Sequence, residues 1–366
     1  IKAGTELYAG DAKKPFKVVH PLLLQGKNTA DTDELHAGDI GALSKVDDLY
    51  YGCVLHSDPA DAGIVLPRPP YPRPMFGLAI EPARRGDESR MGIVLQKMLA
   101  EDPTLAVDHD AQLNETVLRG LTEMHVRTVL ERMKDQFKLE VTTSAPSVPY
   151  RETIGAAAEG HARHKKQTGG AGQFGEVFLK VEPLPRGAGF EFVDRVKGGV
   201  IPFNLIPAVE KGVREVLATG YMAGYPITDI RVTVYDGKSH PVDSKEVAFV
   251  AAGRKAMLDA LAKAQPQILE PIVEIAVSAP ESTMGAITGD IAARRGQVQG
   301  TDNLAPGVME IKALVPLSEL TGYAARLHAL TQGAGAFTMD LADYHTVPAQ
   351  KAQELASHYQ RKDEED

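Results

Sequence analysis

Two segments of the chain share one order of hydrophobic patterns. Within residues 73–149, short β-prone runs alternate with two segments, 87–103 and 122–137, in which apolar residues recur every three or four positions as in amphipathic helices. The predicted order is strand, helix, strand, strand, helix, strand, and residues 271–348 repeat it. We therefore expect two ferredoxin-like βαββαβ domains, a layered fold that says little about function.

The remaining segments predict different folds. Residues 1–72 consist of short β-prone runs separated by Gly and Asp turns, which is typical of a small barrel or sandwich. The last of these runs lies at 63–74, where a cluster of prolines also indicates a linker. Residues 150–270 mix strands with two helices, and residues 349–366 begin as a helix and end in a charged run. The whole chain is expected to be a multi-domain α+β protein.

Composition narrows the class of protein. The chain has 366 residues, enough for roughly two to four domains, and a single cysteine, Cys53, which excludes an intrachain disulfide. No apolar run is long enough to cross a membrane, so we expect a cytoplasmic protein without a membrane partner. The net charge of −9 argues against indiscriminate binding of nucleic acid. Residues 150–270 differ, since they hold 16 Lys and Arg against 14 Asp and Glu, a net of +2.

A GKS tripeptide at 237–239 has the residues that end a phosphate-binding P-loop. Such a loop requires a glycine five positions before the glycine of GKS, and that position is Val232, within a predicted strand. The pattern GxxxxGK[ST] occurs nowhere else in the chain. No nucleotide site is therefore predicted within these residues.

His240 follows this tripeptide and has two polar neighbours, Asp243 and Ser244. The three residue types could form a catalytic triad, but the strained turn that usually holds the nucleophile is absent. Asp243 followed by Glu246 matches a helix N-cap with its capping box, which explains the carboxylates without catalysis. We therefore predict a helix cap formed by Asp243, Ser244 and Glu246. This cap leaves His240 exposed and without an assigned role.

Residues 161–177, HARHKKQTGGAGQFGEV, contain four glycines and two histidines. A glycine-rich loop allows the backbone to approach a phosphate closely, although a glycine-rich hairpin explains the same pattern and is favoured by spacing alone. His161 and His164 have no third ligand at a recognisable spacing, so a metal site is not predicted. Near the C-terminal end of another predicted helix, Arg294 and Arg295 complement the helix dipole.

Several motifs together resemble bacterial translation elongation factor G. They include KKQTGGAGQFGEV, AGYPITDIRVTVYDGKSHPVDSKEVAF, GDIAARRGQV and VPLSELTGYAARLHALTQGAGAF, and the similarity covers essentially the whole chain. The resemblance implies a partial β-barrel at 1–72 (domain II), a ferredoxin-like domain III at 73–149, domain IV at 150–270, and a ferredoxin-like domain V at 271–348 with a C-terminal helix at 349–366. It also places the family's GTP-binding domain before residue 1.

The resemblance further implies that domain IV contacts RNA while tRNA and mRNA move through the ribosome. Two loops at the tip of domain IV would supply the contacts, with Gln173 and His240 as their main polar residues. The full set of expected RNA-contact residues is Gly169, Gly170, Gly172, Gln173, Gly175, Lys238, Ser239 and His240. Arg294 and Arg295 become candidate ribosome contacts in domain V.

The resemblance also bears on cofactors and partners. The expected partners are the ribosome, with its rRNA and ribosomal proteins, and the bound tRNA and mRNA; the protein itself is expected to be a monomer. GTP and Mg²⁺ would be bound only by the missing N-terminal domain, so this portion is expected to carry no catalytic, cofactor or metal residues. The intact protein would be a GTPase, whereas this portion alone would be inactive.

Departures from the family pattern leave alternatives open. Ala171 stands where the family usually has arginine in GGRGQ, and Pro241 and Lys245 alter the second tip loop. Such changes are compatible with a divergent paralogue as well as with the housekeeping translocase. A ribosome-protection or ribosome-recycling factor of the same fold is one alternative. From other classes, a free-standing enzyme using His240 and Asp243, and a non-ribosomal RNA-binding module, are further hypotheses.

Overall fold

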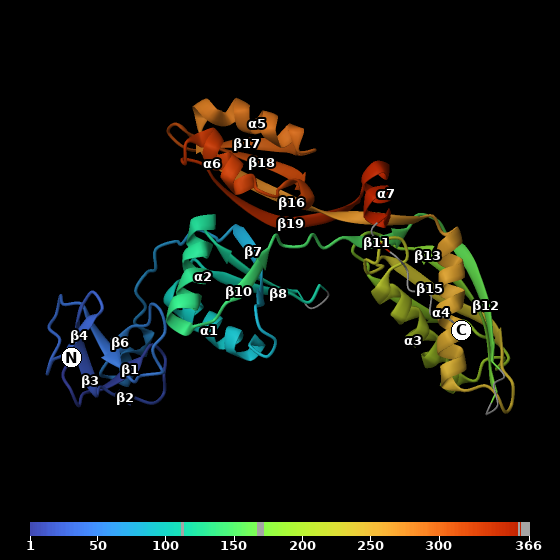
Figure 1. The fold of residues 1–366 in the computed structure, drawn as a ribbon, viewed down its shortest axis with the longest axis horizontal. Helices are drawn as coiled ribbons and strands as arrows, with labels where there is room; N and C mark the ends of the chain where they lie inside the picture. The colour runs from blue at the N-terminus through green and yellow to red at the C-terminus, as the bar shows by residue number, and fades with distance from the viewer. Residues whose placement is uncertain (111–112, 167–171, 358, 360–366) are drawn as a thin grey trace. The chain divides into compact units, whose positions relative to one another are not determined.

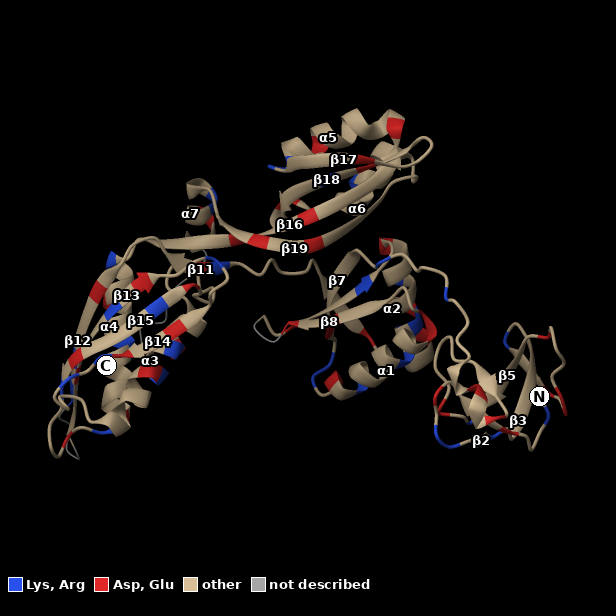
Figure 2. Ribbon diagram, turned by 180° about the vertical axis from the view of Figure 1, so that it is seen from behind, with Lys and Arg blue, Asp and Glu red and all other residues tan. Residues whose placement is uncertain are grey.

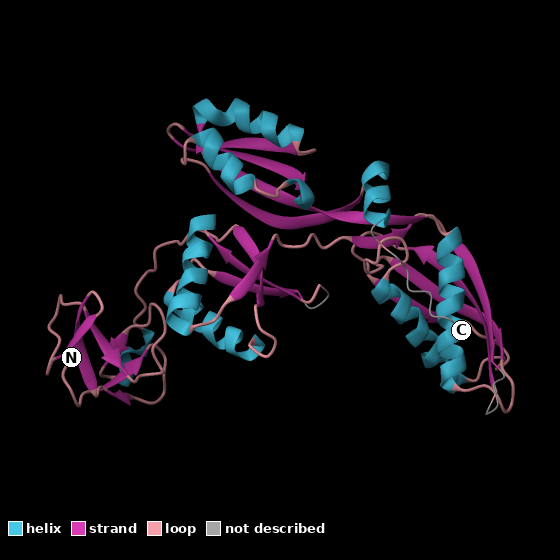
Figure 3. Ribbon diagram, viewed as in Figure 1, coloured by secondary structure: helices cyan, strands magenta, loops and turns pink. Residues whose placement is uncertain are grey.

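The computed structural model describes residues 1–110, 113–166, 172–357 and 359 (Figure 1). Helices and strands are mixed throughout these residues, which confirms the predicted multi-domain α+β fold (Figure 3). The chain divides into two compact units, Ile1–Pro146 and Ser147–Asp366. Within the described residues, every helix is too short or too polar to cross a lipid bilayer.

Residues 1–72, the expected domain II, contain two sheets of three strands each, with the orders β2-β1-β6 and β4-β3-β5, and they form no closed barrel. Its elements are β1 (Glu6–Ala9), β2 (Phe16–Lys17), β3 (His20–Gln25), β4 (Asn28–Asp31), β5 (Gly41–Ser44), β6 (Leu55–His56) and the 3-10 helix η1 (Pro59–Gly63). Leu7, Ala9, Phe16 and Val18 form a small core. The strand expected at 63–74 is absent, because its prolines lack the N–H groups that a β-ladder requires.

Domain III has a four-stranded antiparallel sheet with the order β10-β7-β9-β8 and two helices, as its pattern predicts. Its elements are β7 (Phe76–Pro82), α1 (Glu88–Glu101), β8 (Ala106–Asp110), β9 (Glu115–Gly120), α2 (Glu123–Phe137) and β10 (Val141–Ser144). The apolar stripes of both helices pack with Ile80 and Leu118 of the sheet in one core. The Thr122 hydroxyl caps α2 by accepting a 3.1 Å hydrogen bond from His125 N.

Domain V repeats this topology, with the strand order β19-β16-β18-β17. Its elements are β16 (Pro266–Pro280), η3 (Glu281–Thr283), α5 (Met284–Ala293), β17 (Gln297–Ala305), β18 (Val308–Pro316), η4 (Leu317–Glu319), α6 (Tyr323–Thr331) and β19 (Ala336–Thr346). Ile287 and Ile291 of α5 and Leu327 of α6 are fully buried against the sheet. The predicted duplication of the ferredoxin-like fold is therefore confirmed.

Domain IV has a different sheet, with the order β12-β13-β15-β14, in which β14 and β15 are parallel. Its elements are β12 (Ala158–Lys166), β13 (Gln173–Pro183), β14 (Phe190–Asp194), η2 (Phe203–Leu205), α3 (Ile206–Thr219), β15 (Ile230–Lys238) and α4 (Glu246–Lys263). Helix α4 lies very close to β12, because a Cβ added to Gly160 would be 2.1 Å from Ala256 O. Only glycine fits at that position.

One long strand continues from domain IV into domain V. β11 (Arg151–Ile154) pairs with Pro266–Leu269 at the start of β16, whereas β18 pairs with Ile272–Pro280 of the same strand. Helix α7 (Ala349–Ser357) follows β19 and packs Ala352 and Leu355 on a small apolar cluster that includes Tyr150 and Ile268. The second compact unit is therefore held together by a shared strand and by its last helix.

The carboxylate of Glu152, on β11, is buried in a ring of backbone donors. Its side chain accepts hydrogen bonds from the N–H groups of Tyr221, Met222, Ala223 and Tyr225 at 2.7–3.1 Å. The residue is 1% exposed. Glu152 thereby fixes the loop between α3 and β15 onto β11.

Candidate functional site

A basic pocket of about 490 Å³ lies where β12 ends, β13 begins and β15 ends. We call it the tip pocket. Strand pairing brings these ends together, since Lys166 lies opposite Gln173 and Glu176 opposite Lys238. The pocket is lined by residues from both predicted RNA-contact loops, among them Gly172, Gln173, Lys238, Ser239 and His240.

The tip pocket carries positive charge that the described residues do not neutralise by ion pairing. Arg163, Lys165, Lys166 and Lys238 line it, and among the described residues none of these side chains forms an ion pair. Figure 2 shows basic residues (blue) at this end of β12. Of the described lining residues, Asp243 alone supplies a carboxylate. Such a site favours an anion, and clustered unpaired cations are typical of phosphate contacts.

His240 presents one ring nitrogen to the outside. Its Nδ1 lies 3.2 Å from Asp243 N and 3.4 Å from Val242 N, so two backbone N–H groups point at this atom. The Asp243 carboxylate is also 3.3 Å from Nδ1, which would favour a hydrogen there. We favour the tautomer with hydrogen on Nε2, because two donors face Nδ1. The side chain is 52% exposed, and Nε2, which has no hydrogen-bond partner among the described residues, can then donate to a ligand.

The predicted helix cap at this site is wrong. Helix α4 begins at Glu246 with Lys245 as its N-cap, and no side chain caps it. The Ser244 hydroxyl instead accepts from His240 N at 2.7 Å and donates to Phe174 O at 2.8 Å. Asp243 O accepts from Phe174 N at 2.9 Å. Asp243 and Ser244 thus attach the loop between β15 and α4 to β13. This tertiary contact forms in place of the helix cap that the local pattern predicted.

The same contacts exclude a triad made of these residues. The Ser244 hydroxyl donates to a backbone carbonyl rather than to the His240 ring, so the nucleophile and the base are not hydrogen-bonded. Glu246 is 68% exposed by side chain and lies 4.0 Å from Lys211. It contributes only charge near the N-terminus of α4.

The predicted glycine-rich contacts divide into three groups. Gly169 and Gly170 lie outside the described residues. Gly172 lines the tip pocket, where an added Cβ would be 2.7 Å from the Asp243 carboxyl group. Gly175 is buried in β13, and its added Cβ would be 3.0 Å from Ala248 O on α4. The RNA contact at Gly175 stays a prediction, whereas its lack of a side chain lets α4 pack closely on β13.

Gln173 has a partner that the sequence did not suggest. Its Oε1 lies 3.0 Å from His164 Nε2, across the β12–β13 pairing. His164 therefore orients the amide of Gln173 at the edge of the tip pocket. His161 is likewise occupied, since its Nε2 is 2.9 Å from Glu176 Oε1. Among the described residues no cluster of three or more His, Cys, Asp or Glu side chains could hold a metal ion.

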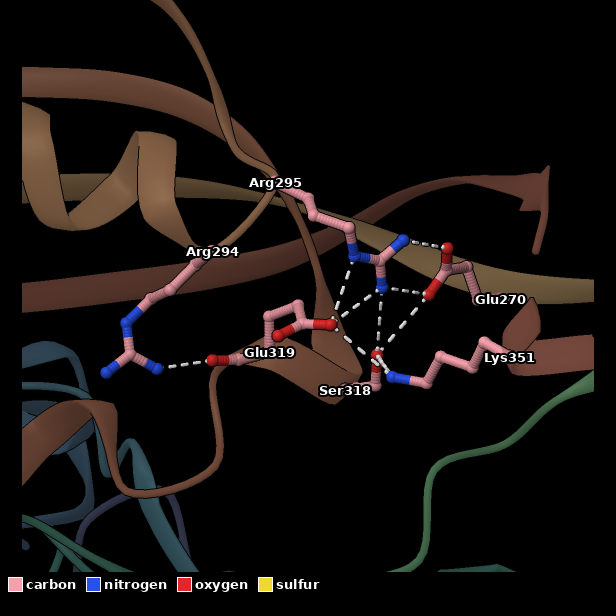
Figure 4. Close-up of polar contacts among 6 residues, drawn as sticks. All are labelled: Glu270, Arg294, Arg295, Ser318, Glu319 and Lys351. Atoms are coloured by element: carbon pink, nitrogen blue, oxygen red, sulfur yellow. Dashed lines mark hydrogen bonds and ion pairs between the residues drawn. The ribbon is translucent and has the colours of Figure 1, made fainter. Parts of the chain in front are cut away.

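Arg295, one of the two candidate ribosome contacts, is held in a network of charges (Figure 4). Its guanidinium binds both carboxylate oxygens of Glu270 at 2.6 and 2.8 Å, and Glu319 at 2.9 and 3.0 Å. Lys351 of α7 donates to Ser318 at 3.1 Å and to Glu319 at 3.4 Å. The network ties β16, the end of α5, η4 and α7 together.

Arg294, the other candidate, is also used within domain V. Its Nε donates to Asp290 at 2.8 Å, its Nη1 donates to Glu319 O, and its guanidinium lies 5.2 Å from the Tyr323 ring centroid. Arg326 binds the second oxygen of Asp290 at 3.0 Å. The ribosome contact of both arginines stays a prediction, whereas their internal contacts give them a structural role.

These ion pairs change the acidity of two carboxyl groups. Burial acts in the opposite direction, but the hydrogen bonds from Arg294 and Arg326 hold the pKa of Asp290 below its ordinary value of 3.8. Burial also opposes the shift at Glu319, where the bond from Arg295 holds the pKa below 4.5. A carboxyl group with a depressed folded-state pKa stabilises the fold above its unfolded-state pKa, and this stability is lost as the pH falls through the folded-state pKa.

We therefore expect domain V to lose stability, on the order of 1 kcal/mol, as the pH falls below about 4.5. Thermal unfolding followed by circular dichroism over a series of pH values would measure the loss. An Asp290→Asn variant should show a weaker pH dependence than the parent chain. A parent melting temperature that stays constant on acidification would contradict the expectation.

Similarity to known protein families shows to which class of protein the chain belongs. Residues 71–145, 146–265 and 267–355 match the family models for elongation factor G domain III, elongation factor G domain IV and the elongation factor G C-terminus. The fold is thus that of a translation elongation factor. More narrowly, the chain belongs to the elongation factor G family, and the tip pocket lies in the segment that matches domain IV.

One solved structure is similar over nearly the whole chain. A crystal structure of a protein from Thermus thermophilus is similar, with a TM-score of 0.80 and 36% sequence identity. The match covers 98% of this chain and 53% of that protein. The chain therefore spans about half the length of the relative that it matches.

Proposed function

We propose that this chain is the ribosome-binding portion of a translational GTPase that promotes the movement of tRNA and mRNA. The tip pocket carries the proposal, since it gathers four cations that have no carboxylate partner among the described residues beside the exposed ring of His240. Cations and N–H donors bind phosphates and base edges, and they position RNA without making or breaking a bond. GTP and Mg²⁺ would be bound by a domain outside these residues.

The full-length protein offers a direct test. Lys238→Ala or His240→Ala should slow single-turnover translocation roughly tenfold or more, because a charge-assisted hydrogen bond contributes about 1.5–3 kcal/mol. Ribosome-stimulated GTP turnover should be retained. Lys180→Ala is the matched control, since Lys180 is on the same sheet but pairs with Glu182 at 2.9 Å. Unchanged translocation in both tip variants would refute the proposal.

A ribosome-protection or recycling factor of the same fold is the second candidate. It is favoured by Ala171, which replaces the arginine usual in the first tip loop. Poly-phenylalanine synthesis by the full-length protein separates the two candidates, since a protection or recycling factor should not support it. A GxxxxGK[ST] motif encoded upstream would establish the GTPase class for both.

A further inference from the structure

One face of the domain IV sheet is left uncovered by the helices that the structure describes. Figures 1 and 2 view it from opposite sides and show α3 and α4 on the same face. Val177, Leu179 and Val181 of β13 are 0% exposed and pack in the core with these helices. Because side chains alternate along a strand, Phe174, Glu176 and Phe178 point to the other face, which we call the open face.

Aromatic rings follow one another across the open face. The His161 and Phe178 rings stack with centroids 4.1 Å apart and an interplanar angle of 20°, and the Tyr235 ring lies 6.3 Å from Phe178. Closer to the tip, the Arg163 guanidinium lies 5.1 Å from the centroid of Phe174. The Phe174 ring in turn is 6.4 Å from His240. The rings thus lead from the tip pocket onto the middle of the sheet.

The ion pairing of cations on the open face also changes from the tip pocket toward the middle of the sheet. Near the tip, Arg163, Lys165 and Lys238 form no ion pair among the described residues. Farther along the strands, the cations are neutralised, since Lys180 pairs with Glu182 and Arg231 with Glu191. Uncompensated positive charge is therefore confined to the half of the face that adjoins the tip pocket.

We call the half of the open face that adjoins the tip pocket the tip half. One of its carboxylates is shielded from solvent. Glu176 is 7% exposed, and its Oε1 is bound by His161. Its Oε2 is buried without a hydrogen-bond partner among the described residues. The exposed chemistry of the tip half therefore consists of ring systems, cations and one exposed carboxylate, Asp236, which lies opposite Phe178 on β15. Proteins bind single-stranded nucleic acid with rings and cations, because bases stack on rings and cations follow the phosphates.

We propose that the open face, from His240 to Phe178, binds a segment of single-stranded RNA that continues from the tip pocket. The inference rests on the proposed function, which supplies the RNA at the tip. The strand from Gln173 to Phe178 is about 17 Å long, which corresponds to roughly three to five nucleotides. We place the end of this RNA-binding surface at Lys180 and Arg231, because their charges are already paired with carboxylates. A protein partner is less suited, because the three cations of the tip half, Arg163, Lys165 and Lys238, outnumber its exposed carboxylate, Asp236.

The test compares RNA lengths on the 366-residue chain at about 50 mM salt, where binding to an acidic protein is strongest. Oligouridylates of about three and about nine nucleotides are titrated, and the Kd values are measured by NMR. Both should shift tip resonances, but only the longer RNA should also shift those of His161 and Phe178. Phe178→Leu should weaken binding of the longer RNA roughly fivefold or more and leave the shorter unchanged.

The control is Phe192→Leu, whose ring packs on the helix-covered core. It should bind both RNAs like the parent chain. Equal affinity for the two lengths, or an unaffected Phe178→Leu variant, would overturn the proposed binding of RNA to the open face. The proposed RNA contact at the tip pocket would stay intact. Lys238→Ala should weaken binding of both lengths, and its failure to do so would count against the tip proposal instead.

A second measurement uses the full-length protein on the ribosome. A photoreactive amino acid placed at position 178 should crosslink to RNA when the tip is engaged. Crosslinks to ribosomal protein alone would identify the open face as a protein contact and overturn the inference.

Discussion

Replacing Glu152 with glutamine should destabilise the chain by about 3–5 kcal/mol. The carboxylate accepts two backbone N–H groups on each oxygen, from Tyr221 and Met222 on one and from Ala223 and Tyr225 on the other. Glutamine retains one oxygen but turns an NH₂ group toward two donors. Those donors lose their acceptor at a residue that is 1% exposed, so water cannot replace it.

Tyrosine fluorescence can follow this unfolding, since the chain has no tryptophan and the Tyr150 and Tyr225 rings lie 5.1 Å apart beside the site. Hydrogen exchange should also show the loss, as faster exchange of the amides that Glu152 holds. The control is Glu246→Gln, an exposed glutamate, which should change stability by less than about 0.5 kcal/mol. Equal stability of the two variants would show that the ring of donors contributes little.

Most of the correct predictions came from apolar residues that recur at helical spacing. In α1, Met91, Val94, Leu95 and Met98 recur at helical spacing, and all four are buried. The equivalent pattern predicted the helices of domain V, and the repeated order of elements then predicted both ferredoxin-like sheets. Such patterns are local, because each element shows its buried face in its own sequence.

Strand β12 was anticipated only through the glycine-rich hairpin favoured for residues 161–177, and its own residues lack a strand pattern for a physical reason. It contains Gly160 and Ala162 on the helix side and His161, Arg163 and Lys165 on the open face. Close packing of α4 requires small residues where an ordinary strand would show large apolar ones. The usual alternation of apolar and polar residues is therefore missing.

The contacts that shape the site come from distant parts of the chain. Ser244 bonds to Phe174, which is 70 residues away, and Glu152 bonds to donors 69 to 73 residues away. A local motif such as the capping box cannot anticipate these partners, and here it gave the wrong assignment. The resemblance of whole motifs assigned Lys238 and His240 to one tip of the domain, and both residues line the same pocket, although their contact with RNA stays a prediction.

Removing the Arg295 side chain should have a comparable effect on domain V. Arg295→Ala would leave Glu270, which is 2% exposed, as a buried carboxylate without its bidentate partner. Breaking a buried pair on one side costs about 3–5 kcal/mol, because the remaining charge keeps its desolvation penalty. The hydrogen bonds that Arg295 donates to Glu319 would be lost as well.

Thermal unfolding of a double-mutant cycle would isolate the pair. Glu270→Gln in the Arg295→Ala background should recover part of the loss, because it removes the unpaired charge. Arg326→Ala is the control, since Arg326 is 53% exposed and its ion pair with Asp290 should contribute about 1 kcal/mol or less. Additive effects of the two Arg295 and Glu270 changes would contradict the coupling. A coupled result would mean that Arg295 acts first as a structural clamp of domain V, and any ribosome contact would then depend on the geometry that it maintains.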